Sequence, residues 1–339
     1  MYYRIIFSII KAILIIISLI KYKTVYLILL IIIFVEILKS YFALLYLKNN
    51  HEFEFAKINK DVIKKMFKYN LQVSSSWIIG KIGQSIDKLI LIALVSSSNF
   101  AIYSLGCIQV PLLSIFYNSI GEVTLTKIGL LSFDKRNNNE VNRLYKKMVS
   151  VNAMLTLPIL CFSYFQIENI FLLLFGNIYK GSADIFKITS LITLIQMTGF
   201  GYIIRGYGKT RPLLISNLTR LILGMLLSYI LIGYLGVTGA AIAYTSVFFI
   251  NGIILLYYSS KIIDTSISML LPFKMIFNIL LISLLSLMII YPLKYLNIEV
   301  IYFVPLSAIC YLSLILTCYL KIKIIKLEDI KRLYNEVYR

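Results

Sequence analysis

Long apolar runs separated by short polar segments extend over most of the chain. A helix crosses the hydrocarbon core of a bilayer with about 20 largely apolar residues, within a range of about 17 to 25. Ten segments meet or approach that length: residues 5–20, 24–47, 69–95, 101–126, 149–165, 183–204, 212–232, 238–260, 271–292 and 301–320. The pattern predicts an all-α fold, a polytopic transmembrane helix bundle of about ten spans.

Basic residues are concentrated in alternate loops between these segments. If residue 1 is cytoplasmic, the inward loops and termini hold 24 Lys and Arg residues and the outward loops hold 4. Basic residues in short loops are retained in the cytoplasm, so this asymmetry predicts a protein of the cytoplasmic (inner) membrane with both termini inside. Two basic stretches, at 57–68 and 321–339, are typical of amphipathic helices on anionic lipid headgroups, although a solvated basic loop is the simpler interpretation and requires no specific partner.

Composition excludes several other classes. Sixty per cent of the residues are apolar, 14% are charged and the mean hydropathy is +0.86, whereas about a quarter of a soluble domain is charged. The net charge of +19 would suggest nucleic acid as a partner, but its restriction to one set of loops argues against that. Four cysteines without CxxC spacing and a single histidine, His51, predict no metal site, no cofactor and no disulfide framework.

Ten ionisable residues fall within the predicted spans, and each is a candidate functional group because charge is costly in hydrocarbon. They are Lys11, Glu36, Lys39, Lys81, Asp87, Lys88, Glu122, Asp184, Lys187 and Arg220. Glu36 with Lys39, and Asp184 with Lys187, are three residues apart, so each pair is expected to be locally neutralised.

The third predicted span has a polar stripe along one helix face. Its members recur at steps of three and four: Asn70, Ser74, Trp77, Lys81, Gln84 and Lys88. Such a face is expected to line a water-filled cavity or a polar helix interface rather than lipid. Lys81 lies near the middle of the span, which favours a cavity-lining role over a buried structural pair. Asp87 points elsewhere on the helix.

Two weaker polar pairs occur in other spans. Asn118 and Glu122 are four residues apart in the fourth span, and Asn217 and Arg220 are three apart in the seventh. Such side chains often hydrogen-bond neighbouring helices, so they do not by themselves identify a site.

Three stretches resemble the Wzx-type oligosaccharide flippases of the multidrug/oligosaccharidyl-lipid/polysaccharide exporter superfamily. The first is SSSWIIGKIGQSIDKLILIALVSSSNFAIYSLG (74–106), with Asp87 and Lys88 before a short loop and a helix that carries Tyr103. The others are GYGKTRPLLISNLTRLIL (206–223) and GYLGVTGAAIAYTS (233–246).

The resemblance implies a MATE-like exporter architecture and transport without covalent catalysis. The implied cargo is a lipid-linked (polyprenyl diphosphate) oligosaccharide for cell-surface polysaccharide, such as the O-antigen of lipopolysaccharide, moved by alternating access. Of the residues here, the resemblance implies only Lys81, Lys88 and Arg220 as contacts to a diphosphate or acidic sugar. Trp77 and Gln84 are further cavity candidates because they share the polar stripe. Asp87 and Glu122 would be ion-coupling or structural residues. Other implied partners are membrane lipids and glycan-assembly proteins.

Family members usually have twelve or fourteen spans. The chain is therefore expected to lack the first four helices of its first lobe. This would make it a fragment, a late-start gene model or the product of a decayed gene. The expected domains are the last two helices of the first lobe (1–50), a basic cytoplasmic linker (51–68), a six-helix second lobe (69–260), two accessory helices (261–320) and a basic cytoplasmic tail (321–339).

Two other functions stay open. In a multidrug exporter of the same superfamily, an acidic residue such as Asp87 or Glu122 would couple export to the movement of an ion. A membrane-embedded glycan polymerase or acyltransferase would need a large outer loop or a catalytic cluster facing outward. The outward loops are short and His51 is predicted on the inner side, which disfavours the enzyme. A purely structural membrane partner is disfavoured by the polar stripe.

Overall fold

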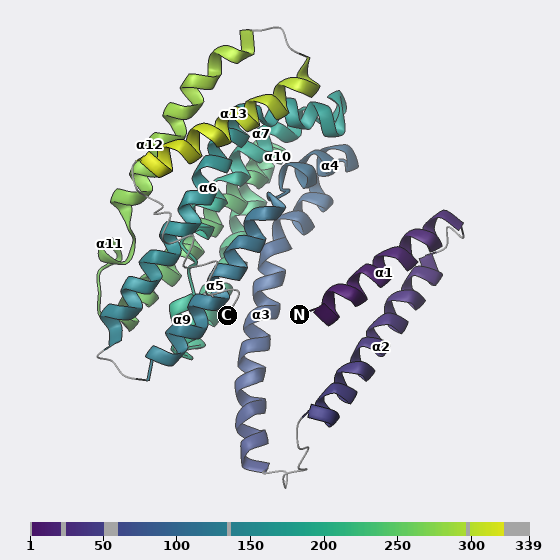
Figure 1. Ribbon diagram of the computed structural model, residues 1–339, viewed down its shortest axis with the longest axis vertical. Helices are drawn as coiled ribbons and strands as arrows, with labels where there is room; N and C mark the ends of the chain where they lie inside the picture. The colour runs from purple at the N-terminus through teal and green to yellow at the C-terminus, as the bar shows by residue number, and fades with distance from the viewer. Residues whose placement is uncertain (1, 22–24, 51–59, 134–136, 296–298, 322–339) are drawn as a thin grey trace. The chain divides into compact units, whose positions relative to one another are not determined.

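The computed structural model describes residues 2–21, 25–50, 60–133, 137–295 and 299–321 (Figure 1). Helices and short turns make up these ranges, which contain no β-strand, so the all-α prediction is confirmed for them. His51, the first half of the predicted linker (51–59 of 51–68) and nearly all of the predicted tail (322–339) lie outside the described residues. The chain divides into two compact units, Met1–Met66 and Phe67–Arg339.

Two long helices, here called the N-terminal hairpin, make up most of the first unit. They are α1 (Tyr2–Lys21) and α2 (Val25–Asn50). The rings of Phe7 and Phe42 approach to 6.0 Å between the two helices. Most large side chains of both helices are exposed, as expected where lipid rather than water is the solvent.

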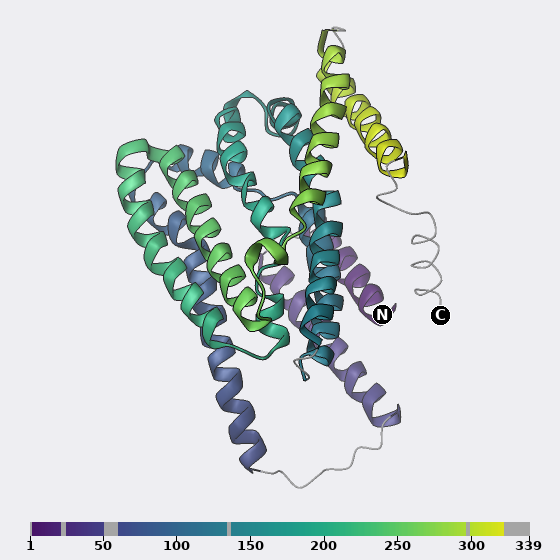
Figure 2. The same cartoon turned by 90° about the vertical axis from the view of Figure 1, so that its left-hand side faces the viewer.

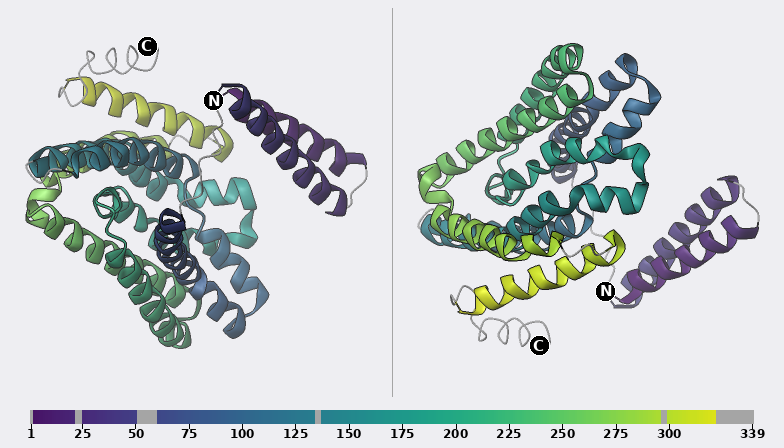
Figure 3. Two further views of the ribbon diagram at one scale, coloured as in Figure 1. Left: turned by 90° about the horizontal axis from the view of Figure 1, so that it is seen from below. Right: turned by 90° about the horizontal axis from the view of Figure 1, so that it is seen from above.

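The second unit, here called the main unit, contains most of α3 and all later helices. Its helices are α3 (Lys60–Leu94), α4 (Ser97–Gly106), α5 (Pro111–Leu131), α6 (Asn138–Phe175), α7 (Gly181–Ser190), α8 (Ile192–Gln196), α9 (Tyr202–Gly206), α10 (Arg211–Ile262), α11 (Ile267–Leu270), α12 (Phe273–Ile290) and α13 (Val300–Lys321). Figure 2 shows α10 on one side of this unit and α12 with α13 on the other. Helix α6 packs against α5, α12 and α13. Figure 3 shows the ribbon from below and from above.

Helix α10 folds back on itself and supplies two of the predicted spans. Gly236 separates the two halves of α10, with φ 58° and ψ −131°. Glycine adopts this conformation readily, whereas other residues would be strained in it. The halves run antiparallel in Figure 2. The Asn251 side-chain amide donates to the Ser216 carbonyl at 2.9 Å, which ties the second half to the first.

The fourth predicted span is interrupted, contrary to the expectation of one continuous helix over 101–126. Helix α4 ends at Gly106, and α5 begins at Pro111, which has no backbone N–H to continue a helix. A Cβ at Gly106 would lie 2.8 Å from the Ser182 carbonyl oxygen, so glycine permits close contact between α4 and α7. The Thr189 hydroxyl donates to the Gly106 carbonyl at 2.7 Å, which satisfies a group left free by the break.

The sixth predicted span, 183–204, is also discontinuous. It consists of α7, α8 and α9, with Gly199 and Gly201 at positive φ in the break between α8 and α9. The buried Asn152 of α6 donates to the Met197 carbonyl at 3.0 Å. Irregular backbone at membrane depth is tolerated where protein groups satisfy it in this way.

Five helical segments among the described residues are long and apolar enough to cross a membrane, judged by length and composition. They are Tyr26–Tyr46, Asn138–Phe175, Arg211–Ile262, Phe273–Leu293 and Val300–Lys321. Helix α6 is longer than the predicted span 149–165 because it continues through its charged first turns, and its 38 residues extend about 57 Å at 1.5 Å each.

The glycine turn of α10 provides a test of the fold. A Cβ at Gly239 would lie 1.9 Å from the Leu231 carbonyl oxygen, a backbone atom that cannot move aside, whereas a Cβ at Gly233 meets nothing within 4 Å. Gly239→Ala is expected to lower the free energy of unfolding by about 1–3 kcal/mol through overpacking. Thermal denaturation of the purified protein in detergent would measure this, with Gly233→Ala as the matched control. Equal melting temperatures for the two variants would contradict the described packing.

Candidate functional site

Helix α3 has two distinct faces in the main unit. Its buried face carries Ser76, Gly80, Gly83, Asp87 and Leu91. Its other face carries the predicted stripe, here called the α3 polar face: Asn70, Ser74, Trp77, Lys81, Gln84 and Lys88. All six are exposed except Lys88, which is half-buried, and the exposed fraction of Trp77 is 64%. Asp87 points away from this face.

The orientation of α3 is set by close packing against the first half of α10. A Cβ at Gly83 would lie 3.4 Å from the backbone of Leu221, and a Cβ at Gly80 would lie 3.0 Å from the amide nitrogen of Asn217. That amide donates to the Ser76 carbonyl at 2.9 Å. Small residues let the two backbones approach, and the polar face is thereby left on the opposite side.

Lys81 and Trp77 contact each other on the α3 polar face. The Lys81 Nζ atom lies 5.6 Å from the centroid of the Trp77 ring, within cation–π range. Among the described residues, no carboxylate forms an ion pair with Lys81 or Lys88. The face therefore presents cationic groups and an aromatic ring, and its lysines form no salt bridge within the described residues.

Glu122 forms a contact that the sequence did not predict. Its Oε1 atom lies 3.4 Å from Nη2 of Arg205, which also lies over the Tyr202 ring at 5.6 Å. The contact joins α5 to α9, the short helix that follows the glycine break. Glu122 and Arg205 are both exposed, so the pair contributes at most about 1 kcal/mol to stability. In the sequence, the glycine-rich stretch GFGYIIRGYG (199–208) was the signal for the break between α8 and α9 that precedes Arg205.

A buried polar cluster lies on the other side of α3. Tyr103 of α4 donates a hydrogen bond to Oδ2 of Asp87. The guanidinium of Arg220 stacks 4.6 Å from the ring centroid of Phe248, in the second half of α10. The exposed fractions of Asp87 and Arg220 are 2% and 5%. Arg220 is therefore buried here, apart from the exposed side chains with which the resemblance grouped it.

The cluster adjoins a small cavity and not a substrate-sized one. Cys107 and Tyr244 line a space of about 20 Å³ between the α4–α5 connection, α6, α7 and α10. A space of this size accommodates about one water molecule and is far too small for a sugar.

The predicted local pair of Glu36 and Lys39 is confirmed, at 3.0 Å within α2. Lys11 of α1 adds a second contact to the same carboxylate at 3.1 Å. Three intramembrane charges of the N-terminal hairpin thus lie together between its two helices.

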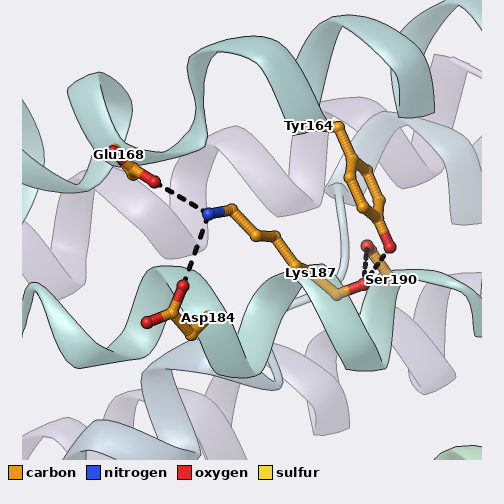
Figure 4. Close-up of polar contacts among 5 residues, drawn as sticks. All are labelled: Tyr164, Glu168, Asp184, Lys187 and Ser190. Atoms are coloured by element: carbon orange, nitrogen blue, oxygen red, sulfur yellow. Dashed lines mark hydrogen bonds and ion pairs between the residues drawn. The ribbon is translucent and has the colours of Figure 1, made fainter.

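The predicted pair of Asp184 and Lys187 is confirmed at 3.3 Å, and Glu168 of α6 approaches the same ammonium group at 2.8 Å. Figure 4 shows Lys187 extending between the two carboxylates. Beside it, the hydroxyls of Tyr164 and Ser190 both donate to the Lys187 carbonyl. These contacts link α6 to α7, and the two carboxylates neutralise the charge of Lys187 locally.

The α3 polar face combines cationic, aromatic and neutral hydrogen-bonding side chains. Cations and an exposed indole lie along one helix face, with neutral Gln84 and Ser74 available for hydrogen bonds. In the part of the chain that the structure describes, no three His, Cys, Asp or Glu side chains gather to hold a metal ion.

Comparison with known proteins relates the chain to polysaccharide assembly. A capsular polysaccharide biosynthesis protein of Staphylococcus aureus, CapF, is 26% identical over 201 residues, which make up 59% of this chain and 50% of CapF. The chain thus spans about half the length of this curated relative.

The fold resembles that of a solved transporter. The structure of the lipid II flippase MurJ, in an inward closed conformation, superimposes with a TM-score of 0.63 at 18% identity, over 91% of this chain and 66% of MurJ. This likeness confirms the predicted fold class, a multi-span membrane helix bundle.

The profile of the family described as "Polysaccharide biosynthesis protein" matches residues 1–184, more than half of the chain. This match covers the N-terminal hairpin, the whole of α3 and its polar face. The chain belongs to the polysaccharide biosynthesis protein family.

Proposed function

We propose that this protein translocates a lipid-linked oligosaccharide across the cytoplasmic membrane during the synthesis of a cell-surface polysaccharide. The observation that carries the proposal is the α3 polar face, on which neither Lys81 nor Lys88 forms a salt bridge among the described residues. Family membership and a fold shared with a protein named as a lipid II flippase support the same direction.

The chemistry of the cargo accounts for the composition of this face. A polyprenyl diphosphate oligosaccharide has an anionic diphosphate, a polar glycan and a long apolar tail. Lys81 and Lys88 would hold the diphosphate through charge-assisted hydrogen bonds. Trp77 would stack against a sugar ring, with Gln84 as a hydrogen-bonding partner. The tail would stay in the lipid.

Movement of the polar head would follow alternating access, in which the α3 polar face is open first to one side of the membrane and then to the other. We place both termini in the cytoplasm, on the evidence of the basic loops. The cargo class includes O-antigen precursors, and proteins that build or extend the glycan would be its partners.

The first test asks whether water reaches the α3 polar face. Thiols react with maleimides as thiolates, which form where water is present. In a background without native cysteines, Gln84→Cys is expected to react with a water-soluble maleimide, and Ile82→Cys, an exposed apolar position on the same helix, is expected to react at least about tenfold more slowly. Failure of both positions to react would show that the face contacts lipid or protein, and would remove the proposed cavity.

The second test measures transport directly. The full chain would be reconstituted in liposomes with a fluorescent polyprenyl diphosphate oligosaccharide, and the fluorescence accessible to external dithionite would be followed. Lys81→Ala is expected to slow translocation by roughly 10- to 100-fold, because a hydrogen bond to a charged group contributes about 1.5–3 kcal/mol.

Two variants control that measurement. Lys81→Arg keeps the charge and should retain most of the rate, while Lys274→Ala removes an exposed lysine at the start of α12 and should not change it. Translocation at the wild-type rate by Lys81→Ala would exclude Lys81 as a cargo contact. Transport of a cationic drug but not of the lipid-linked glycan would favour the multidrug exporter.

The third test concerns orientation. Tyr234→Cys, in the exposed turn of α10, should be labelled by an impermeant maleimide in intact cells. Lys209→Cys, exposed before the start of α10, should be labelled only after the cells are permeabilised. The reverse result would overturn the proposed topology.

A further inference from the structure

A cluster of three charged side chains lies at the middle of the two helices of the N-terminal hairpin. Glu36 is the central residue of the apolar segment Tyr26–Tyr46, ten residues from either end. At about 1.5 Å per residue, roughly 15 Å of helix separates it from each end, which is farther than a side chain extends. Lys11, the tenth of the 20 residues of α1, contacts Glu36 at 3.1 Å, and Lys39 contacts it at 3.0 Å. The cluster therefore stays at mid-membrane depth when α2 spans the bilayer.

The charges of this cluster do not cancel one another. Both lysines share one carboxylate, so Glu36 balances one of the two positive charges, and the three side chains together carry a net charge of +1. These side chains are 34–47% exposed. A net charge exposed at mid-membrane depth is unfavourable in hydrocarbon. An anionic group beside the cluster would offset that cost.

An open groove on α2 adjoins the cluster. Glu36 and Ser40 are its polar lining residues, and the apolar ones include Ile33, Ile37 and Leu44. The groove therefore extends from the charged cluster over an apolar surface of the same helix. This combination matches an amphiphile in which a phosphate group is joined directly to a hydrocarbon chain.

Other occupants fit the cluster less well than a phosphate. A second copy of this chain would bring the same net positive charge to the contact, and the two clusters would repel each other. Water would hydrate the charge, but the groove beside the cluster is mostly apolar. A phosphate supplies the negative charge, and an ammonium group has three donor hydrogens, so a lysine that contacts Glu36 can still donate to a phosphate oxygen.

We propose that Lys11, Glu36 and Lys39 form a second binding site for the diphosphate of a polyprenyl-linked cargo, with the first isoprene units in the α2 groove. The two lysines bind phosphate oxygens, and Glu36 is a positioning residue that holds both ammonium groups close together. This inference rests on the proposed function and extends it, because a diphosphate that crosses the membrane must pass the depth at which these lysines lie.

The test is equilibrium binding of radiolabelled geranylgeranyl diphosphate to the full chain in detergent, with geranylgeraniol as the uncharged probe. Lys11→Met and Lys39→Met each remove one positive charge, keep a long side chain and leave one lysine on Glu36. Each variant is expected to weaken diphosphate binding at least about tenfold, because it removes a charge-assisted hydrogen bond, and to bind geranylgeraniol as the wild type does. Lys21→Met, at the end of α1, is the matched control and should not change either affinity.

Glu36→Gln separates anion binding from helix packing. It removes the carboxylate charge and raises the net charge of the cluster from +1 to +2, so the diphosphate should bind at least about threefold more tightly. A cluster that only holds α1 against α2 predicts a lower melting temperature with no gain in affinity. An affinity that is unchanged or weaker in Glu36→Gln would therefore overturn the proposal.

The outcomes also separate this site from the α3 polar face. If Lys81→Ala weakens diphosphate binding while Lys11→Met and Lys39→Met bind as the wild type does, the inference fails and the proposed function stands. If the wild type does not bind geranylgeranyl diphosphate, both fail. If a methionine variant is not recovered as folded protein, the affinity of Glu36→Gln decides between anion binding and helix packing.

Discussion

The close approach of α3 to the first half of α10 is the contact on which the rest of the site depends. Gly80 and Gly83 on α3 leave room for Asn217 and for the backbone of Leu221, and the Asn217 amide fixes the register by bonding to Ser76. Because a helix has one rotational setting for a given contact face, this packing determines where every other α3 side chain points. The polar face is exposed as a consequence, and Asp87 is turned inward.

The intramembrane charges are accommodated in three different ways. Glu36 and Lys187 are each held by two opposite charges from the same and a neighbouring helix. Asp87, which accepts a hydrogen bond from Tyr103, and Arg220, which stacks on Phe248, are both buried. Lys81 differs from all of these, because it is exposed and contacts an aromatic ring instead of a carboxylate. It is therefore the strongest candidate for contact with an external anion.

Helix periodicity was sufficient to predict which α3 residues share a face. Steps of three and four placed Lys81 with Trp77 and excluded Asp87, because side-chain direction within a helix depends only on local geometry. The same reasoning correctly paired Glu36 with Lys39. It could not supply Lys11 or Glu168, since partners from a second helix depend on tertiary packing.

Continuity of the helices was less predictable from hydropathy. An apolar run does not show where its backbone breaks, and the breaks at Pro111 and Gly201 depend on partners such as Thr189 and Asn152 that satisfy the freed groups. The burial of Arg220 could not be predicted from the sequence either, because its neighbour Phe248 comes from the second half of α10, which folds back on the first.

The central claim is that the α3 polar face receives the polar head of a lipid-linked glycan. Photo-crosslinking with a polyprenyl diphosphate oligosaccharide that carries a diazirine beside the diphosphate tests this most directly, with the adducts located by mass spectrometry. The account predicts adducts at Trp77, Lys81 and Gln84 that an excess of unlabelled lipid-linked glycan removes. Adducts confined to the apolar positions Ile78 and Ile82, or unaffected by that competitor, would contradict it.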